Sequence, residues 1–525
     1  MRITIVVLAA ALLLPAGAAA QTYPEPKEPG KVEPKPPRPY ETHTVCKKGR
    51  CDFRSIQKAV NAADAGDTIR VRRGVYREAV RINGRRKRYL KLIGDPRRPG
   101  RVVLDGRGRS QNAVAVSGAD EVTVSGFKAR GYRANGFFIT SVNGYTMTKL
   151  IAQRTGVYGL FAFNSIGGRI TRSEAYHVSD GAFYVGQTPP QDRPKPTMVR
   201  NILGRESAIG FSGTNMRYVT LTRSRFYNNA VGIGVAALDS EKYPPSVENR
   251  IVGNEVFWNN FNFRAGRPPF EPRQSGIGPL LPSGTGILLL GGRDFRVEDN
   301  RIYGHNLVGL VALDSVLAVE NPDAASFDRN VIRGNEWGLG GRDRNARDIA
   351  YDGSGSDNCF ALEGVADTVP ADRSTFATCT GTNGFSEAAR DTMLRWVGNG
   401  AIAAWIRNPH VRKRGIRPLE VFGARAGSAR AAARRTVRIG DNFFLPDTLK
   451  VKPRTQIVWR WPSADEGGDV HDVKLRSGPE GARRFHSEAA ATDYEFRRRL
   501  KVPGRYRVVC TLHEEMRLRI TLRRR

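Results

Sequence analysis

The sequence predicts an all-β protein in which a solenoid of short strands is followed by a β-sandwich. Runs of β-branched and aromatic residues are short and end at glycine or asparagine, which is typical of strands separated by turns. Similar pieces, such as NGFFI, YGLFAF, DGAFYV and VGIGV, recur along the middle of the chain. A short, repeated period indicates a solenoid, whereas the non-repetitive alternation near the C-terminus indicates a sandwich.

The N-terminus has the features of a secretory signal. Arg2 precedes an apolar run, and the small residues Ala18-Ala19-Ala20 predict cleavage after Ala20, so that 1–20 is the signal peptide. The Pro-, Lys- and Glu-rich segment 21–43 then predicts an extended linker. Because no later apolar run is long enough to cross a bilayer, we expect a secreted, extracytoplasmic protein with no transmembrane segment after cleavage.

The predicted solenoid covers 44–385. Residues 54–64 have helical spacing and are expected to cap the first coil. Each later unit fits one coil of three short strands, with Ile and Val stacked inside and Asn in ladders at the turns. The gaps between the recurring glycines are 23, 22, 29, 22, 54 and 23 residues. These glycines are Gly136, Gly159, Gly181, Gly210, Gly232, Gly286 and Gly309.

The opening segment SIQKAVNAADAGDTIRVRRGVYRE, followed by N-x-I-x-G-N coils, resembles right-handed parallel β-helix proteins of the pectate-lyase-like superfamily. The resemblance covers 44–385 and implies that fold. Members include lyases, hydrolases, esterases and non-catalytic proteins, so the fold alone implies no activity.

Two further units follow the solenoid. Residues 386–433 combine helical spacing with a basic, low-complexity stretch and predict a partly helical connector. Residues 434–525 alternate in short β runs, which predicts a sandwich.

One loop of this sandwich concentrates metal-binding side chains. The stretch YRVVCTLHEEMRLRITL places Cys510, His513 and Met516 between two predicted strands, and His471 begins another strand. A thiolate, two imidazoles and a thioether form the trigonal site of blue copper proteins, whereas zinc usually has no thioether ligand. The alternative is coincidence, with Cys510 buried as a small apolar residue. His486 is expected at the surface, outside the site.

The same unit resembles the cupredoxin family of the plastocyanin/amicyanin type. The matching features are NFFLPDTLKVKPRTQIVWRW, the VHDV histidine, VPGRYRVVC and the spacing C-x2-H-x2-M. The resemblance implies that His471, Cys510, His513 and Met516 bind one copper ion in a type 1 site. The sequence departs from the family at Glu514-Glu515, where proline and a small residue are common. The implied function is electron transfer or copper storage, with the β-helix as scaffold or docking domain.

The five cysteines fit an oxidising compartment. Cys46 and Cys51 are close enough in sequence to form a disulfide, and Cys359 and Cys379 enclose a turn-rich loop and are expected to form a second. This pairing leaves Cys510 free, and a free thiol outside the cell oxidises unless something such as a metal holds it.

An alternative function is binding or cleavage of polysaccharides by the β-helix, with the copper domain as an accessory. Candidate catalytic carboxylates are Asp180, Asp239 and Asp314, although aspartates in such turns commonly bond backbone N–H groups. The formal charge of +33, from 84 Lys and Arg against 51 Asp and Glu, favours partners such as acidic glycans or cell-wall polymers. No nucleic-acid motif is present, so we expect no nucleic-acid partner. An electron carrier or copper-binding protein with an unnamed redox partner is favoured over a lyase or hydrolase.

Overall fold

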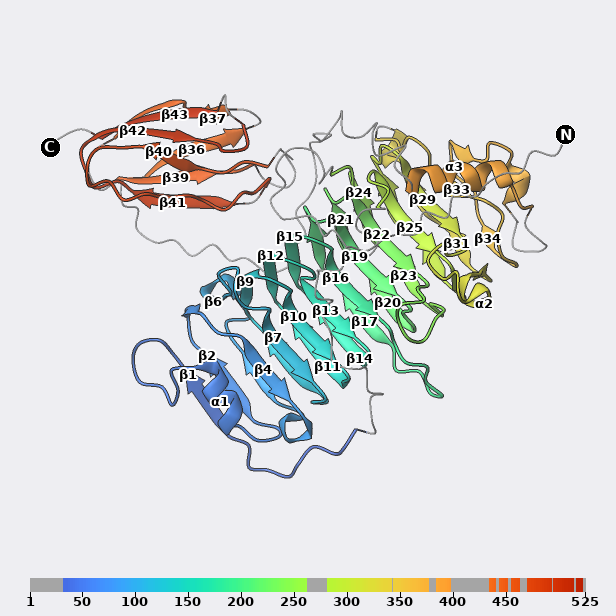
Figure 1. Cartoon of the computed structure of the whole chain (residues 1–525), viewed down its shortest axis with the longest axis horizontal. Helices are drawn as coiled ribbons and strands as arrows, with labels where there is room; N and C mark the ends of the chain where they lie inside the picture. The colour runs from blue at the N-terminus through green and yellow to red at the C-terminus, as the bar shows by residue number, and fades with distance from the viewer. Residues whose placement is uncertain are drawn as a thin grey trace.

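The computed structural model describes most of the chain, and it has two β domains (Figure 1). The described residues are 32–261, 281–341, 343–376, 384–397, 434–440, 443–451, 455–462, 470–492, 494–513 and 516–522. The predicted signal peptide and most of the predicted connector lie outside these residues. In the part of the chain that the structure describes, no helix has the length and apolar character needed to cross a membrane.

Three parallel sheets form the first domain, and each coil of the chain adds one strand to each sheet. Sheet A contains β1 (Thr42–Val45), β2 (Thr68–Val71), β5 (Lys91–Ile93), β8 (Val122–Ser125), β11 (Asn143–Thr148), β14 (Ile166–Thr171), β17 (Thr197–Arg200), β20 (Val219–Thr222), β23 (Arg250–Val252), β27 (Arg296–Glu298), β31 (Val331–Arg333) and β34 (Cys359–Phe360). Sheet B contains β3 (Gly74–Tyr76), β6 (Val102–Asp105), β9 (Lys128–Tyr132), β12 (Ile151–Thr155), β15 (Glu174–Val178), β18 (Leu203–Arg205), β21 (Arg225–Tyr227), β24 (Glu255–Phe257), β28 (Arg301–Tyr303) and β32 (Glu336–Trp337). Sheet C contains β4 (Val80–Asn83), β7 (Asn112–Ser117), β10 (Asn135–Thr140), β13 (Leu160–Phe163), β16 (Gly181–Gly186), β19 (Ile209–Thr214), β22 (Val231–Ala236), β25 (Thr285–Leu290), β29 (Val308–Leu313), β33 (Ile349–Tyr351) and β35 (Thr368–Val369).

Shorter elements complete this domain. They are α1 (Ile56–Ala62), α2 (Pro322–Ala325), α3 (Glu387–Val397), the strand pair β26 (Gly292–Arg293) and β30 (Phe327–Asp328), and the 3₁₀ turns η1 (Arg85–Lys87), η2 (Pro99–Arg101), η4 (Leu339–Gly341) and η5 (Arg373–Thr375). Ser55 caps α1 by accepting a hydrogen bond from the Lys58 N–H. Ile56 and Val60 belong to the β-helix core, so α1 covers the first coil, as expected from the sequence.

Aligned side chains hold the coils together. In sheet C, Phe137 is in register with Leu160, and Leu160 with Phe183, and all three lie in one core. The predicted asparagine ladder is also present: the Asn254 side-chain amide donates to Asn300 Oδ1, and the Asn300 amide donates to Asn335 Oδ1, each at 3.0 Å. Such stacking leaves no coil able to bury its apolar face alone.

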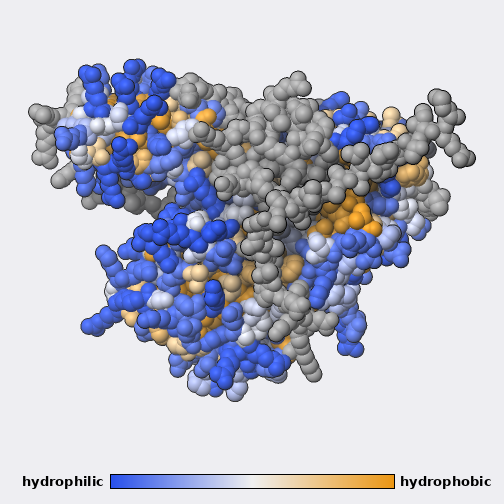
Figure 2. All heavy atoms as spheres, viewed as in Figure 1, coloured by the Kyte–Doolittle hydropathy of each residue, from blue (hydrophilic) through white to orange (hydrophobic). Residues whose placement is uncertain are grey.

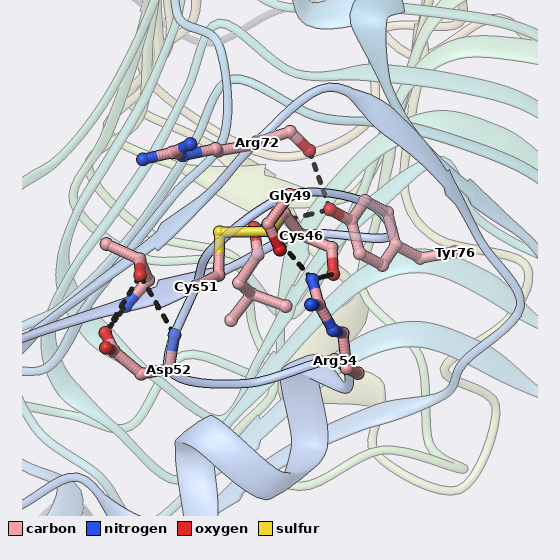
Figure 3. The surroundings of a disulfide bond; sticks show 9 residues. Cys46, Gly49, Cys51, Asp52, Arg54, Arg72 and Tyr76 are labelled. Carbon is pink, nitrogen blue, oxygen red and sulfur yellow. Dashed lines mark hydrogen bonds between the residues drawn. A yellow bond between two sulfur atoms is a disulfide. The ribbon is translucent and has the colours of Figure 1, made fainter.

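A disulfide joins Cys46 and Cys51 just after β1, as predicted (Figure 3). The Arg54 guanidinium donates to the Cys46 carbonyl oxygen at 3.2 Å, and the Tyr76 hydroxyl donates to the Arg72 carbonyl oxygen at 2.7 Å. Cys359 is buried at the start of β34, whereas Cys379 lies outside the described residues, so their pairing stays a prediction.

The second domain is a sandwich of two four-stranded sheets around its own apolar core. Sheet I has the order β37-β36-β39-β41 and sheet II the order β38-β43-β42-β40. The bounds are β36 (Arg434–Gly440), β37 (Phe443–Leu445), β38 (Thr448–Val451), β39 (Gln456–Arg460), β40 (Lys474–Ser477), β41 (Glu495–Arg499), β42 (Gly504–Val509) and β43 (Arg517–Leu522). The predicted all-β class, a parallel β-helix followed by a β-sandwich, is confirmed.

Candidate metal centre

Sheet II places the predicted ligands at one end of the sandwich. Cys510 follows β42 directly, and Met516 precedes β43. The loop between them is closed by two backbone bonds, from the Cys510 N–H to the Met516 carbonyl and from the Met516 N–H to the His513 carbonyl, each 3.2 Å. Because β40 pairs with β42, with Lys474 opposite Val509, His471 comes to lie beside Cys510.

Three ligand atoms converge. The Cys510 Sγ atom lies 3.9 Å from His471 Nδ1 and 3.7 Å from His513 Nδ1, and all three atoms are within 4.8 Å of one another. Sulfur and nitrogen ligands at typical lengths of about 2.3 and 2.05 Å from one ion, separated by 120°, would lie about 3.8 Å apart. The two observed sulfur–nitrogen separations therefore fit a trigonal metal site.

The site is shielded from water. His471, Cys510 and Met516 are 0%, 2% and 1% exposed, while His513 is partly exposed. Cys510 is a free thiol, and burial raises its pKa to about 11, so a bound cation has to displace its proton. Met516 is buried in the sandwich core together with Cys510, and its backbone is hydrogen-bonded to Cys510 and His513, so it belongs to the same loop as two of the candidate ligands.

Asp472 fastens the ligand loop. Its N–H donates to Cys510 Sγ at 3.5 Å, and its carboxylate accepts from the Thr511 N–H at 2.6 Å and from the Thr511 hydroxyl. His486, half-exposed, also bonds this carboxylate through Nε2. Although burial opposes ionisation, these hydrogen bonds lower the pKa of Asp472. Sequence reasoning missed Asp472 and set His486 aside, since neither belongs to the ligand spacing.

The sandwich contacts the β-helix through the segment 487–494. Thr492 donates from its hydroxyl to Glu206 Oε1 at 3.1 Å, and Glu488 forms an ion pair with Arg130 at 3.4 Å. Figure 1 shows the sandwich beside the strands of sheet B around β12 and β15. The β-helix side of this contact is charged, and Arg205 and Glu206 are its buried members.

Glu206 is the centre of this charged contact. Its carboxylate accepts from the Arg205 guanidinium at 2.8 Å and bonds His177 Nε2 at 2.9 Å. Burial opposes its ionisation, but the Arg205 charge and the His177 hydrogen bond lower the pKa of Glu206 to about 2. Burial also lowers the pKa of His177, although the bond to Glu206 acts in the opposite direction.

An apolar patch near the ligands also joins the two domains. Val470 and Leu512, sequence neighbours of the two ligand histidines, belong to one cluster with Leu288 and Val311 of sheet C. In β25, Leu288 alternates with Ile287 and Leu289, which point into the β-helix core, so Leu288 lies on the outer side of the sheet. The ligand end of the sandwich therefore packs against the β-helix.

Two of the three candidate carboxylates of the β-helix accept hydrogen bonds from backbone N–H groups. Asp239 accepts from the Glu320 N–H at 2.7 Å, and Asp314 accepts from the Phe327 N–H at 2.9 Å. Strand β25 separates the coils of Asp239 and Asp314, so they are not on neighbouring coils. Asp180 is 5% exposed, at the start of β16.

Asp314 also joins an arginine bridge. Arg390 of α3 lies 3.4 Å from Asp314 and 2.6 Å from the buried Asp352. Burial raises the pKa of Asp314. The bond to the Phe327 N–H supports the turn role that the sequence left open for these aspartates.

No family model and no curated protein matches the sequence. Among solved structures, a Cu-containing nitrite reductase from Thermus scotoductus SA-01 is similar at 19% identity over 19% of this chain and 25% of its own, with a TM-score of 0.16. The A-module of Azotobacter vinelandii mannuronan C-5 epimerase AlgE4 is similar at 13% identity over 60% and 94%, with a TM-score of 0.33. Pectate lyase Pel9A is similar at 14% identity over 66% and 88%, with a TM-score of 0.35. At these values the likenesses establish nothing about activity.

Proposed function

We propose that the sandwich binds one copper ion in a type 1 site and that the protein transfers electrons through it to an unnamed redox partner outside the cell. The observation that carries the proposal is the convergence of Cys510 Sγ with the Nδ1 atoms of His471 and His513 at 3.7 to 3.9 Å. A bound copper ion would supply one-electron oxidation and reduction. The disulfide Cys46–Cys51 fits an oxidising compartment, which supports secretion.

The residues of the chain perform three tasks at this site. Cys510, His471 and His513 supply soft sulfur and imidazole ligands, and Met516 supplies a thioether from the buried side. The Asp472 N–H donates to the cysteine sulfur and its carboxylate holds Thr511, so the loop keeps its shape whether or not a metal is bound. Because His471, Cys510 and Met516 are buried, water has no access to this side of the site, and the ligand geometry would stay the same when the bound metal is oxidised or reduced.

Aerobic titration with Cu(II), followed by visible spectroscopy, tests the proposal. We expect one equivalent to produce an intense visible band and Cys510→Ser to abolish it. Met516→Leu should keep the band with a changed potential, because the trigonal ligands remain. His43→Gln, on β1 of the β-helix, serves as a histidine control and should leave the band unchanged. A colourless Cu(II) complex, or preferential binding of zinc, would contradict the proposal.

A second candidate function is binding or cleavage of an acidic polysaccharide by the β-helix. The net charge of +33 and the fold class favour binding. The roles of Asp239 and Asp314 in backbone bonding do not favour cleavage by these residues. Incubation with polygalacturonate and alginate tests both cleavage and binding. Unsaturated products or new reducing ends would establish cleavage. If the protein forms no such products and is not retained on either polymer, this candidate function is excluded.

A further inference from the structure

Sheet II presents one uniformly cationic face. Its inward side chains, among them Leu449, Leu475, Tyr506 and Leu518, form the sandwich core. Its four strands read TLKV, KLRS, GRYRVV and RLRITL and contain no acidic residue. The cations on these strands, all exposed, are Lys450, Lys474, Arg476, Arg505, Arg507, Arg517 and Arg519. We name these seven residues the cationic face.

Several arginines elsewhere in the described chain are paired with carboxylates. In the β-helix, Arg205 pairs with Glu174, Arg225 with Glu255 and Arg329 with Asp294. On sheet I of the sandwich, Arg460 and Arg497 share Glu495. Among the described residues, no such ion pair involves Arg505, Arg507 or Arg519 of the cationic face.

The arrangement of the cationic face opposes folding. Arg507 lies directly opposite Arg519 in the antiparallel register of β42 and β43. Like charges in opposed positions repel each other and destabilise a sheet. Neighbouring positions on the face are separated by roughly 4.8 Å across strands and roughly 6.7 Å along them, so Arg505, two residues from Arg507 on the same strand, adds to this repulsion. A ligand that carries closely spaced negative charges would relieve it.

We propose that the cationic face of sheet II binds a carboxylate-bearing polysaccharide. Guanidinium groups bind carboxylates through paired hydrogen bonds, and a flat row of them matches an extended polyanion. The outward positions hold Thr and Val besides the cations and no aromatic residue. A protein interface is depleted of charge at its core, and single-stranded nucleic acid stacks on aromatic side chains, so the face suits neither as well.

This site differs from the β-helix surface of the second candidate function and is independent of copper. Figure 2 shows hydrophilic side chains projecting from the sandwich, with apolar residues visible between them. The charged strands β42 and β43 also carry the loop that begins with Cys510 and ends with Met516. A polysaccharide bound here would therefore fix the metal site near the anionic matrix that holds the protein.

The test compares two triple variants of the full secreted chain. Arg505→Gln, Arg507→Gln and Arg519→Gln remove three charges from the face. The control variant, Arg97→Gln, Arg101→Gln and Arg109→Gln, removes three charges from exposed positions of the β-helix. None of these three arginines takes part in an ion pair among the described residues. Binding to polygalacturonate, neutral dextran and duplex DNA is measured at 50 and 200 mM salt. Circular dichroism confirms folding of each variant.

We expect the parent protein to bind polygalacturonate and not dextran. The sheet II variant should bind on the order of tenfold more weakly with a shallower salt dependence, and the β-helix variant should match the parent. Equal loss in both variants, no binding by the parent, or tighter binding to DNA than to polygalacturonate would each overturn the proposal. The Cu(II) band of the sheet II variant reports separately on the metal site.

Discussion

Replacing Glu206 by Gln should destabilise the protein more than any neighbouring change of charge. The carboxylate is 1% exposed, and its partners come from both domains: Arg205 and His177 in the β-helix and Thr492 in the sandwich. Glutamine keeps the shape of the side chain but removes its charge. The Arg205 guanidinium, itself 4% exposed, would then lose the carboxylate of Glu206 and keep that of Glu174.

The size of the effect follows from the pKa of Glu206, which falls from the usual 4.5 to about 2 in the folded protein. Such a shift corresponds to about 3 kcal/mol of stability at pH 7, since each unit is worth about 1.4 kcal/mol. Breaking a buried ion pair costs about 3 to 5 kcal/mol in other proteins, which agrees. Because the folded pKa is depressed, this stability is complete above pH 4.5 and is lost as the pH falls towards 2.

Urea unfolding followed by tryptophan fluorescence, at pH 7 and at pH 3, measures this difference. Glu206→Gln should lower the unfolding free energy by about 3 kcal/mol at pH 7 and by less at pH 3. Glu174→Gln is the matched control, because Glu174 binds the same arginine at 2.7 Å but is 17% exposed and should cost about 1 kcal/mol. Equal costs for the two variants, or a cost for Glu206→Gln that does not change with pH, would refute the reasoning.

Two further predictions concern the ladder and the ligand loop. Asn300→Ala removes side-chain hydrogen bonds to both neighbouring coils and should lower the free energy of unfolding in urea by about 3 kcal/mol. The control Asn321→Ala changes an exposed side chain that makes no capping bond, so it should leave the free energy of unfolding almost unchanged. Asp472→Asn removes the charge that fastens Thr511 and should weaken Cu(II) affinity about tenfold in competition titrations, with the exposed Glu480→Gln as the unaffected control.

The β-helix was predictable because its information is periodic. Phe137, Leu160 and Phe183 stack in register, and the same spacing is visible in the sequence as recurring glycines and apolar pairs. The asparagine ladder follows for the same reason, since each N-x-I-x-G-N unit places its amide at the same turn. Periodicity also located the capping helix, which begins where the repeat begins.

The candidate metal site was predictable where its residues are local. The spacing of Cys510, His513 and Met516 fits one loop, and His471 required only that β40 and β42 be neighbours. Asp472 and His486 could not be found in this way, since a hydrogen bond across 14 residues between a buried carboxylate and a half-exposed imidazole leaves no pattern.

The contact between domains had no sequence signal, because it joins residues far apart in the chain. Arg154 in β12, His177 in β15 and Glu206 directly after β18 occupy equivalent positions on successive coils, and all have positive φ, of 54°, 56° and 51°. Few residues other than glycine adopt such a conformation, so the stacked coils set the backbone geometry at these positions. Thr492 of the sandwich bonds Glu206, the last of the three.

The hydrogen bond from Thr492 to Glu206 and the apolar patch with Val470 and Leu512 both join the sandwich to the β-helix. Thr492 is bound to Glu206, while Val470 and Leu512 beside the ligand histidines pack on the outer side of sheet C. The Thr492 bond to Glu206 therefore links the buried charges of the β-helix to the same domain face that the apolar patch covers. Because Glu206 is also bonded to Arg205 and His177, a change at this carboxylate affects both the β-helix and its contact with the sandwich.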